Sequence, residues 1–249
     1  MTTTTDSRTL TAVPAAGRID APVALPPAAL EPGASAPDEV SSAVAPPAYR
    51  DHAGRYDHRT RTFQHWREIL VKTLAVEPGD TVLDIGCGTG LCLPGLQAKI
   101  GPTGAVVGID ASPHMLDIAA ARVTDNHWRN VHLIPAPIDQ AVIEVTADAA
   151  LFCAVHDILQ SPAALANIFA HLRPGAAVAT IGGKWPHPWL WPLRAWVADL
   201  HAPFITDFTG FDQPWKHLAD YIPDLQVKHL GAGTGYLAHG HYQPREGLS

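Results

Sequence analysis

The stretch that decides the fold is Asp80–Leu91, which reads Asp-Thr-Val-Leu-Asp-Ile-Gly-Cys-Gly-Thr-Gly-Leu. Its β-branched, apolar start, Thr81–Leu83, predicts a short buried strand that runs straight into a turn. Three glycines on alternate positions make up that turn: Gly86, Gly88 and Gly90. Because glycine has no Cβ atom, the chain can bend sharply there and a ligand can lie against bare backbone. Such a ligand also meets the free N–H groups of the helix that is expected to begin at Leu91.

The acidic Asp84, just before the glycines, indicates which kind of ligand the turn accepts. A carboxylate repels a phosphate group, whereas it attracts hydroxyl and amino groups. This charge favours a nucleoside that bears an amino acid over a dinucleotide. A nicotinamide dehydrogenase, the rival enzyme class, needs the spacing Gly-x-Gly-x-x-Gly, and here the glycines alternate strictly.

Outward from this stretch, short apolar runs alternate with runs of helical period. The expected strands are residues 81–83, 105–110, 131–134, 149–154, 176–181, 225–230 and 236–242. The expected helices are residues 63–74, 91–100, 112–123, 163–172, 191–201 and 215–221. This alternation predicts a parallel sheet with right-handed crossovers, which binds ligands beyond the carboxyl ends of its strands. Asp84, Asp110 and the residues after the fourth strand are therefore expected to converge on one rim.

Residues 1–47 differ in composition from the rest of the chain. They are rich in Thr, Ala, Pro and Ser with scattered acids and no apolar period, which predicts a disordered tail. A regulatory or docking role for this tail is the alternative to a solvated leader. The tail lacks the basic start and apolar run of a secretory signal.

Charge and cysteine content limit the binding partners, the cellular compartment and the metals that are expected. The net charge of −7 comes with no basic cluster, which argues against nucleic acid, and no apolar stretch is long enough for stable insertion into a membrane. The three cysteines, Cys87, Cys92 and Cys153, are odd in number and lie in core-like segments, which favours reduced thiols in a cytoplasm. Cys87 and Cys92 lack metal-ligand spacing, and His229, His239 and His241 do not form a convincing ligand set, so no metal is expected. The oligomeric state is left open.

Two motifs resemble those of the class I S-adenosylmethionine-dependent methyltransferases. Val82–Gly90 matches the family's first motif almost letter for letter, and Val106–Asp110, followed by Ser112, Met115 and Leu116, matches the second. The resemblance covers residues 49–179, roughly half of the chain. It implies one methyltransferase domain over residues 48–249: an α/β fold with a Rossmann-like, seven-stranded, mostly parallel sheet, helices on both faces and an antiparallel last strand.

The resemblance also implies which residues hold S-adenosylmethionine. Asp84 and the backbone of Gly86, Cys87, Gly88 and Gly90 are expected to hold the methionine moiety. Asp110 is expected to bind the ribose hydroxyls, with Ala111 and Met115 flanking the adenine. Pro137 stands where the family normally offers an acid to the adenine amino group, and Asp139 or the Ile138 backbone is the expected substitute.

Tyr56-Asp57 and His65-Trp66-Arg67 are similar to the ubiquinone/menaquinone biosynthesis methyltransferases. In that group the tyrosine belongs to an N-terminal lid over the cofactor. Its ring can face the sulfonium, a contact worth about 0.5–2 kcal/mol. A plain core aromatic is the equal alternative for Tyr56.

His156 and Asp157, just past the fourth strand, are the candidates for catalysis. A base is needed when the acceptor must lose a proton, as in O- or ring-carbon methylation. The alternative is that His156 lines the acceptor pocket and Asp157 caps a helical turn. Residues 182–224, in which Trp185, Trp189, Trp191 and Trp196 crowd together with prolines and histidines, predict a substrate lid or insert. A second core layer, or a patch that touches membrane or a partner, is the alternative.

The sequence therefore predicts methyl transfer to a small, largely apolar or aromatic acceptor, such as a quinone precursor, a secondary metabolite or an aminolipid headgroup. A binding module that keeps the cofactor site without transferase activity is the alternative from another class. The two differ in whether demethylated cofactor is formed with any acceptor.

Overall fold

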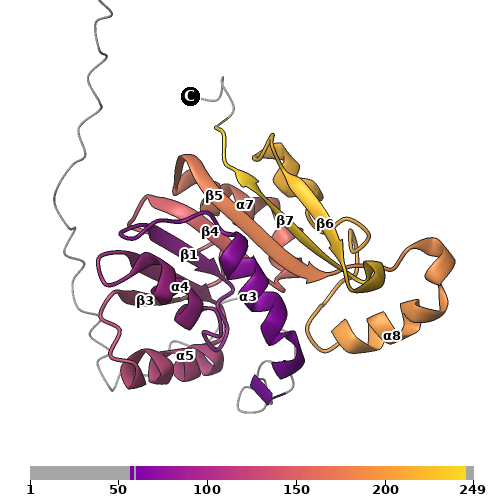
Figure 1. The fold of residues 1–249 in the computed structure, drawn as a ribbon, viewed down its shortest axis with the longest axis horizontal. Coiled ribbons are helices and arrows are strands. Elements are labelled where there is room, and N and C mark those ends of the chain that lie inside the picture. Colours follow the sequence, from indigo (N-terminus) through magenta and orange to yellow (C-terminus); the bar gives the residue numbers. More distant parts are fainter. Residues whose placement is uncertain (1–56, 59, 245–249) are drawn as a thin grey trace, which may run out of the picture. The chain divides into compact units, whose positions relative to one another are not determined.

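The computed structural model describes residues 57–58 and 60–244 (Figure 1). The predicted tail, residues 1–47, lies outside the described residues, and so does Tyr56. Within the described part, no helix combines the length and apolarity needed to cross a membrane.

Seven strands form one sheet in the order β3-β2-β1-β4-β5-β7-β6. They are β1 Thr81–Ile85, β2 Ala105–Asp110, β3 Val131–Pro135, β4 Ala147–Cys153, β5 Leu172–Gly183, β6 Gln226–Leu230 and β7 Gly235–His241. Strands β1 to β5 pair in parallel, and β7 pairs antiparallel with both β5 and β6. The predicted seven-stranded, mostly parallel sheet with one antiparallel strand is confirmed.

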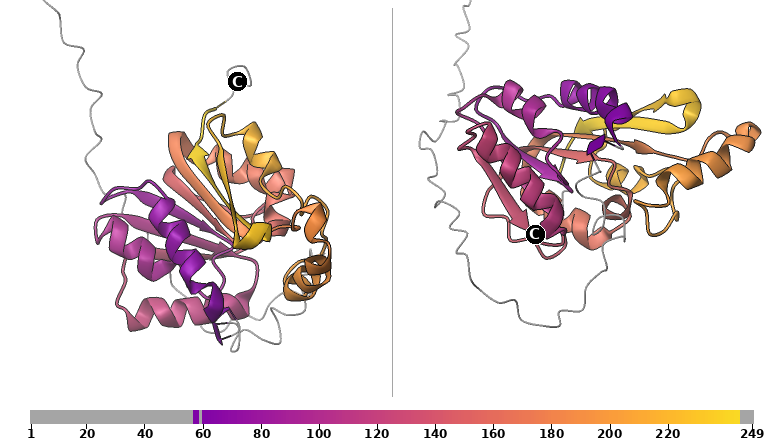
Figure 2. Two further views of the ribbon diagram at one scale, coloured as in Figure 1. Left: turned by 45° about the vertical axis from the view of Figure 1, so that its right-hand side comes forward. Right: turned by 90° about the horizontal axis from the view of Figure 1, so that it is seen from below.

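Helices pack on both faces of this sheet (Figures 1 and 2). The α-helices are α3 Gln64–Thr73, α4 Leu93–Ile100, α5 Pro113–Asp125, α6 His156–Leu159, α7 Pro162–Ala170 and α8 Pro192–His201. Short 3-10 turns are η1 Arg61–Phe63, η2 Pro188–Leu190, η3 Lys216–Asp220 and η4 Gly231–Gly233. Helices α4 and α5 follow β1 and β2, whereas α7 follows β4, which is the alternation that covers both faces of a parallel sheet.

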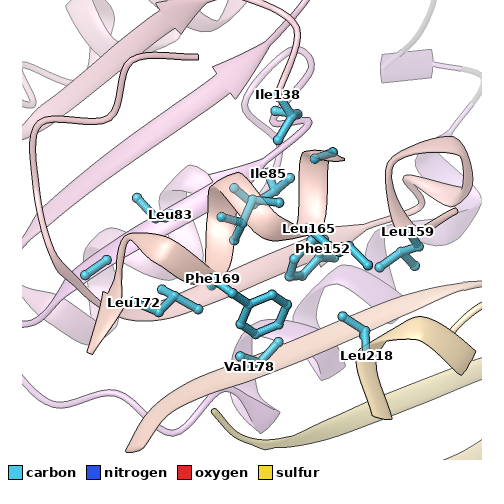
Figure 3. Packing of buried hydrophobic residues seen from close by; sticks show 14 of the residues in the cluster. Leu83, Ile85, Ile138, Phe152, Leu159, Leu165, Phe169, Leu172, Val178 and Leu218 are labelled. Atoms are coloured by element: carbon cyan, nitrogen blue, oxygen red, sulfur yellow. The ribbon is translucent and has the colours of Figure 1, made fainter. Parts of the chain in front are cut away.

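Two buried clusters fill the space between sheet and helices. On one face, Leu83 and Phe152 of the sheet meet Leu165 and Phe169 of α7, with Leu218 of η3 beside them (Figure 3). On the other face, side chains of α3 and α4 cover the alternate strand residues Val82, Val106, Ala149 and Leu151. Consecutive strand residues therefore point to opposite clusters, as β-pleating requires.

Three predicted helices differ from the structure. The helix expected to begin at Leu91 is α4, which begins at Leu93 after the turn residues Leu91 and Cys92. The helix expected to reach residue 172 ends at Ala170, and β5 begins at Leu172 because that residue pairs with Ala147 and because Pro174 disfavours helix in front of it. The helix expected over residues 215–221 is only the 3-10 turn η3, confined between Pro214 and Pro223.

Candidate functional site

Two carboxylates lie on one face of the sheet, at the carboxyl ends of neighbouring strands. Val82 of β1 pairs with Val106 of β2, and both contribute to the cluster under α3 and α4. Side chains alternate along a strand, so Asp84 and Asp110, two and four residues further on, point to that same face. Residues that follow β4 reach the same rim, as the sequence predicts.

Asp84 is a buried carboxylate with an unsatisfied oxygen. Its side chain is 1% exposed, and its Oδ2 has no hydrogen-bond partner among the described residues. Burial, and after it the charge of Asp110, raises the pKa of Asp84 to about 7. A positively charged ligand group placed here would satisfy Oδ2 and offset the cost of the buried charge.

Asp110 is held by the backbone on both sides. Its Oδ2 accepts from the Gly88 N–H at 2.8 Å, and its Oδ1 accepts from the Ser112 N–H at 2.8 Å. Burial raises the pKa of Asp110, and these two bonds act against that rise. Each oxygen keeps a second lone pair, so the carboxylate is oriented and still able to accept from two hydroxyls.

The glycine turn depends on backbone conformations that other residues avoid. Gly86, Gly88 and Gly90 have φ of 63°, 55° and 75°. A Cβ at Gly86 would lie 2.5 Å from Cγ1 of Val155, whereas a Cβ at Gly88 would meet nothing within 4 Å. The turn is therefore closed against the segment after β4 and open at Gly88. Cys87 is buried, and its N–H donates to the Ile109 carbonyl at 3.1 Å.

The residues expected around an adenine are distributed unequally. Ala111 is exposed at the end of β2, whereas Met115 on α5 is fully buried. Pro137 is half-buried and Ile138 is buried, and the Ile138 carbonyl accepts from Asn167 Nδ2 at 2.7 Å. Ala111 and Pro137 thus offer surface to a ligand, while Met115 and Ile138 support that surface from inside.

A hydrogen-bond network that the sequence does not predict links Asp57 to the glycine turn. Asp57 accepts from Thr89 Oγ1 at 2.6 Å and from Arg122 Nη2 at 2.7 Å. Arg122 of α5 also donates through Nε to the Thr89 carbonyl at 3.0 Å. Three distant parts of the chain meet here, which no spacing in the sequence reveals.

A cavity of about 360 Å³ opens beside the carboxyl ends of β4 and β5. Its wall is mainly apolar, with Trp66 of α3, Trp196 of α8 and Phe211 among its residues. None of the described residues that line it is acidic; the polar ones are Thr60, Arg67, Cys153, His156, His201, Thr234 and Tyr236. Val155 belongs to this wall and also abuts Gly86, so the cavity and the glycine turn share a boundary.

His156 presents a defined imidazole to this cavity. It is 6% exposed, and its Nε2 lies 3.0 Å from the Thr209 carbonyl oxygen. A carbonyl accepts only, so Nε2 carries the proton and Nδ1 is left with a lone pair. Nδ1 is buried and has no partner among the described residues. Burial lowers the pKa of His156.

Asp157 does not bind the imidazole. Its Oδ2 accepts from the Thr206 N–H at 3.2 Å and from Thr206 Oγ1 at 2.6 Å. Thr206 lies three residues before Thr209, whose carbonyl contacts His156. Asp157 therefore fastens the segment that orients His156.

His201 and Tyr236 also line the cavity, and the sequence does not predict either of them as a site residue. His201 stands with His156 against Phe211, with ring centroids 5.3 and 5.1 Å from it, and burial lowers the pKa of His201 to about 4. The Tyr236 hydroxyl is fully buried and pairs with Thr180 Oγ1 at 3.2 Å. Both come from segments of the predicted insert and hairpin, which carry no motif.

The cysteines are unpaired, and the part of the chain described holds no group of three or more potential metal ligands. A hydrogen bond with Cys92 lowers the pKa of Cys153, and the Arg67 charge acts in the same direction against burial. His241 Nδ1 lies 2.8 Å from Asp224 Oδ2, on the surface hairpin.

A nucleoside that bears an amino acid fits the rim built by these residues. The unpartnered Asp84 Oδ2 suits an ammonium group, the oriented Asp110 carboxylate suits two hydroxyls, and the bare Gly88 leaves room for close approach. Because Val155 borders both the glycine turn and the apolar cavity, the cavity lies next to this rim.

Comparison with known proteins agrees with this geometry. Residues 82–175 match the family model of a methyltransferase domain. The chain is 21% identical over 194 residues to a 2-phytyl-1,4-naphtoquinone methyltransferase of Trichormus variabilis, covering 74% of this chain and 83% of that protein. It is 29% identical over 150 residues to a demethylmenaquinone methyltransferase of Lactococcus lactis, covering 58% of this chain and 57% of the relative.

The fold also agrees with solved structures. A SAM-dependent methyltransferase from Aquifex aeolicus superposes with a TM-score of 0.55 at 21% identity, over 76% of this chain and 96% of that one. The chain therefore carries a methyltransferase domain over residues 82–175, shares the fold of a solved S-adenosylmethionine-dependent methyltransferase, and is similar to relatives named as quinone methyltransferases.

Proposed function

We propose that this enzyme methylates a neutral, apolar aromatic acceptor that carries a hydroxyl group, of the quinol type, with His156 as the base. Two observations carry the proposal: His156 lines the apolar cavity, and the Nδ1 of the same imidazole is buried without a partner among the described residues. A buried polar atom without a partner is uncommon in proteins, and a hydroxyl of the acceptor would complete it. The quinone methyltransferases among the relatives support an acceptor of this kind.

The charges of the cavity argue against an amine acceptor. Among the described residues, no acidic side chain lines it and the one permanent cation that does is Arg67, whose Nη1 donates to the Thr60 carbonyl at 3.0 Å. A positively charged headgroup placed there would have to give up its hydration without gaining a counter-charge. A flat neutral ring can instead pack against the aromatic side chains of Trp66, Trp196 and Phe211 in the cavity wall.

The residues around the cofactor are proposed to act by binding and orientation. Asp84 would pair with the ammonium group, Asp110 would accept from the ribose hydroxyls, and Ala111 and Pro137 would border the adenine. The backbone of Gly86–Gly90, with Cys87, would follow the methionine part, and Tyr56 would belong to the lid. When bound, S-adenosylmethionine supplies an electrophilic methyl group on a positively charged sulfur.

His156 would take the proton of the acceptor hydroxyl on Nδ1, leaving an oxyanion as nucleophile. The Thr209 carbonyl keeps the proton on Nε2 and so keeps Nδ1 available. Asp157 is proposed as a positioning residue, since it holds Thr206 and through it the segment of Thr209. The apolar wall of the cavity disfavours water, which would otherwise solvate the oxyanion and weaken it as a nucleophile.

The test is methyl transfer from cofactor with a deuterated methyl group to a panel of hydroquinols, simple phenols and primary amines. We expect labelled product with hydroxylated rings and none with amines. His156→Gln should lower kcat about 10²-fold, as for loss of a general base. His171→Gln is the matched control, because His171 also bonds to a backbone carbonyl, that of Asn167, and does not line the cavity. Transfer to amines only, or full activity of His156→Gln, would refute the proposal.

A further inference from the structure

Large apolar side chains are exposed together on the segment that leads into α8. Six large hydrophobic residues of the described chain are exposed, and four of them lie within eight consecutive positions. We name these four the tryptophan surface: Trp189 (71% exposed), Trp191 (75%), Leu193 (37%) and Trp196 (56%). Trp189 belongs to η2, Trp191 stands directly before α8, and Leu193 and Trp196 are in α8, which lies away from the sheet (Figure 1). Water-exposed indole rings in such number mark an interaction surface.

The tryptophan surface is continuous with the proposed acceptor cavity. Leu193, Trp196, Val197 and Leu200 follow the helical spacing i, i+3, i+4, i+7, so they share one face of α8, and all four line the cavity. Leu193 and Trp196 belong to both the cavity wall and the exposed surface. The mouth of the cavity is therefore bordered by the exposed apolar side chains.

The chemistry of this surface suits the interface of a lipid bilayer. Indole places an apolar ring among acyl chains while its N–H meets the headgroups, which is why tryptophan is enriched at membrane–water boundaries. Residues 185–198 contain Arg194 and no acidic residue, whereas the whole chain has a net charge of −7. Arg194 lies 3.9 Å from the centre of the Trp185 ring, so its charge is held against an aromatic face. Within residues 185–198 no carboxylate has to leave water; the next acidic residue, Asp199 of α8, is exposed and can stay hydrated at the edge of the surface.

We propose that the tryptophan surface docks on a lipid bilayer and that an acceptor dissolved in the lipid enters the cavity past Trp196. This inference rests on the proposed function for the nature of the acceptor, but docking itself needs neither cofactor nor acceptor. The contact is interfacial, through side chains of η2 and α8.

The test is sedimentation of the full chain with phosphatidylcholine vesicles, together with tryptophan emission. We expect the protein to sediment with the vesicles and its emission to shift to shorter wavelength. The double variant Trp189→Ala/Trp191→Ala removes exposed rings that do not line the cavity, and it should lower the partition coefficient at least tenfold. Val142→Ala/Val227→Ala is the matched control, because these two are the other exposed large hydrophobic residues, and it should bind as the unmodified chain does.

Activity separates docking from the proposed function. The Trp189→Ala/Trp191→Ala variant should methylate a water-soluble acceptor at the normal rate and a vesicle-dissolved acceptor at least tenfold more slowly. Protein that stays in the supernatant at every lipid concentration, or equal binding by both double variants, would overturn the docking proposal. A concentration-dependent dimer that the tryptophan variant abolishes, without vesicle binding, would overturn it too and assign the surface to a second copy. Vesicle binding without any methyl transfer would instead contradict the proposed function alone.

Discussion

Replacing Asp84 by Asn is expected to stabilise the protein without cofactor and to weaken its binding of cofactor. Asp84 is 1% exposed, and its Oδ2 has no partner among the described residues. The substitution keeps the size of the side chain and removes the buried negative charge. The gain in stability and the loss of binding have the same cause, since the charge that is costly in the free enzyme is the one proposed to pair with the ligand's ammonium group.

The magnitude follows from the pKa of Asp84, which rises from 3.8 to about 7 on folding. At one unit per 1.36 kcal/mol, this shift corresponds to roughly 4 kcal/mol as an upper bound. The folded state keeps the proton between pH 4 and 7 while the unfolded chain releases it. Stability is therefore lost as the pH rises through this window, and the full cost is present above about pH 7. Asn carries no such cost at any pH.

The assay is urea denaturation of Asp84→Asn and of the unmodified chain at pH 5, 6, 7 and 8. The difference in unfolding free energy should grow with pH in favour of the variant, while S-adenosylhomocysteine affinity at pH 8 falls at least tenfold. Asp80→Asn is the control: Asp80 stands just before the same strand, and its Oδ2 accepts from the Glu77 N–H at 2.8 Å. Parallel stability curves, or a variant that is less stable at pH 8, would refute the reasoning.

Three other substitutions probe the base, the residue-57 network and the turn. In the kcat–pH profile of the unmodified enzyme, burial of His156 should place the acid limb below its ordinary value of 6.5, and a limb at 7 or above that disappears in His156→Gln would contradict this. Asp57→Asn removes the carboxylate that pairs with Arg122. Both side chains are partly exposed, so the free energy of unfolding should change by less than about 1 kcal/mol. Calorimetry should nevertheless show severalfold weaker binding of S-adenosylhomocysteine, and equal affinity would show that the network does not support the site. Gly86→Ala puts a Cβ 2.5 Å from a methyl group of Val155 and should lower the free energy of unfolding by about 1–3 kcal/mol more than Gly101→Ala does. Gly101 has a similar φ, but a Cβ there would have no atom within 4 Å. Equal melting temperatures of the two variants would contradict the close packing at Gly86.

The placement of Asp84 and Asp110 on one rim of the sheet could be predicted because both residues lie at strand ends. Asp84 stands one residue before the end of β1 and Asp110 ends β2, and the alternation of strands and helices places the two strands side by side in a parallel sheet. The glycine turn is local as well, since its φ values require glycine whatever surrounds them.

The acceptor side could not be predicted in detail, because it is made by long-range packing. His201 and Phe211 meet His156 across about fifty residues, and no periodic pattern specifies such contacts. The tautomer of His156 depends on a backbone carbonyl, that of Thr209, which any residue type supplies. The same holds for Asp57, whose partners Thr89 and Arg122 come from a loop and a distant helix.

Titration calorimetry with S-adenosylhomocysteine tests most directly whether two strand-end carboxylates and a glycine turn form the nucleoside site. We predict one site per chain with micromolar affinity, no heat with a nicotinamide dinucleotide, and at least fivefold weaker binding by Asp110→Ala, corresponding to about 1 kcal/mol for a lost hydrogen bond to a charged group. Absence of heat with S-adenosylhomocysteine, or undiminished binding by Asp110→Ala, would contradict the account.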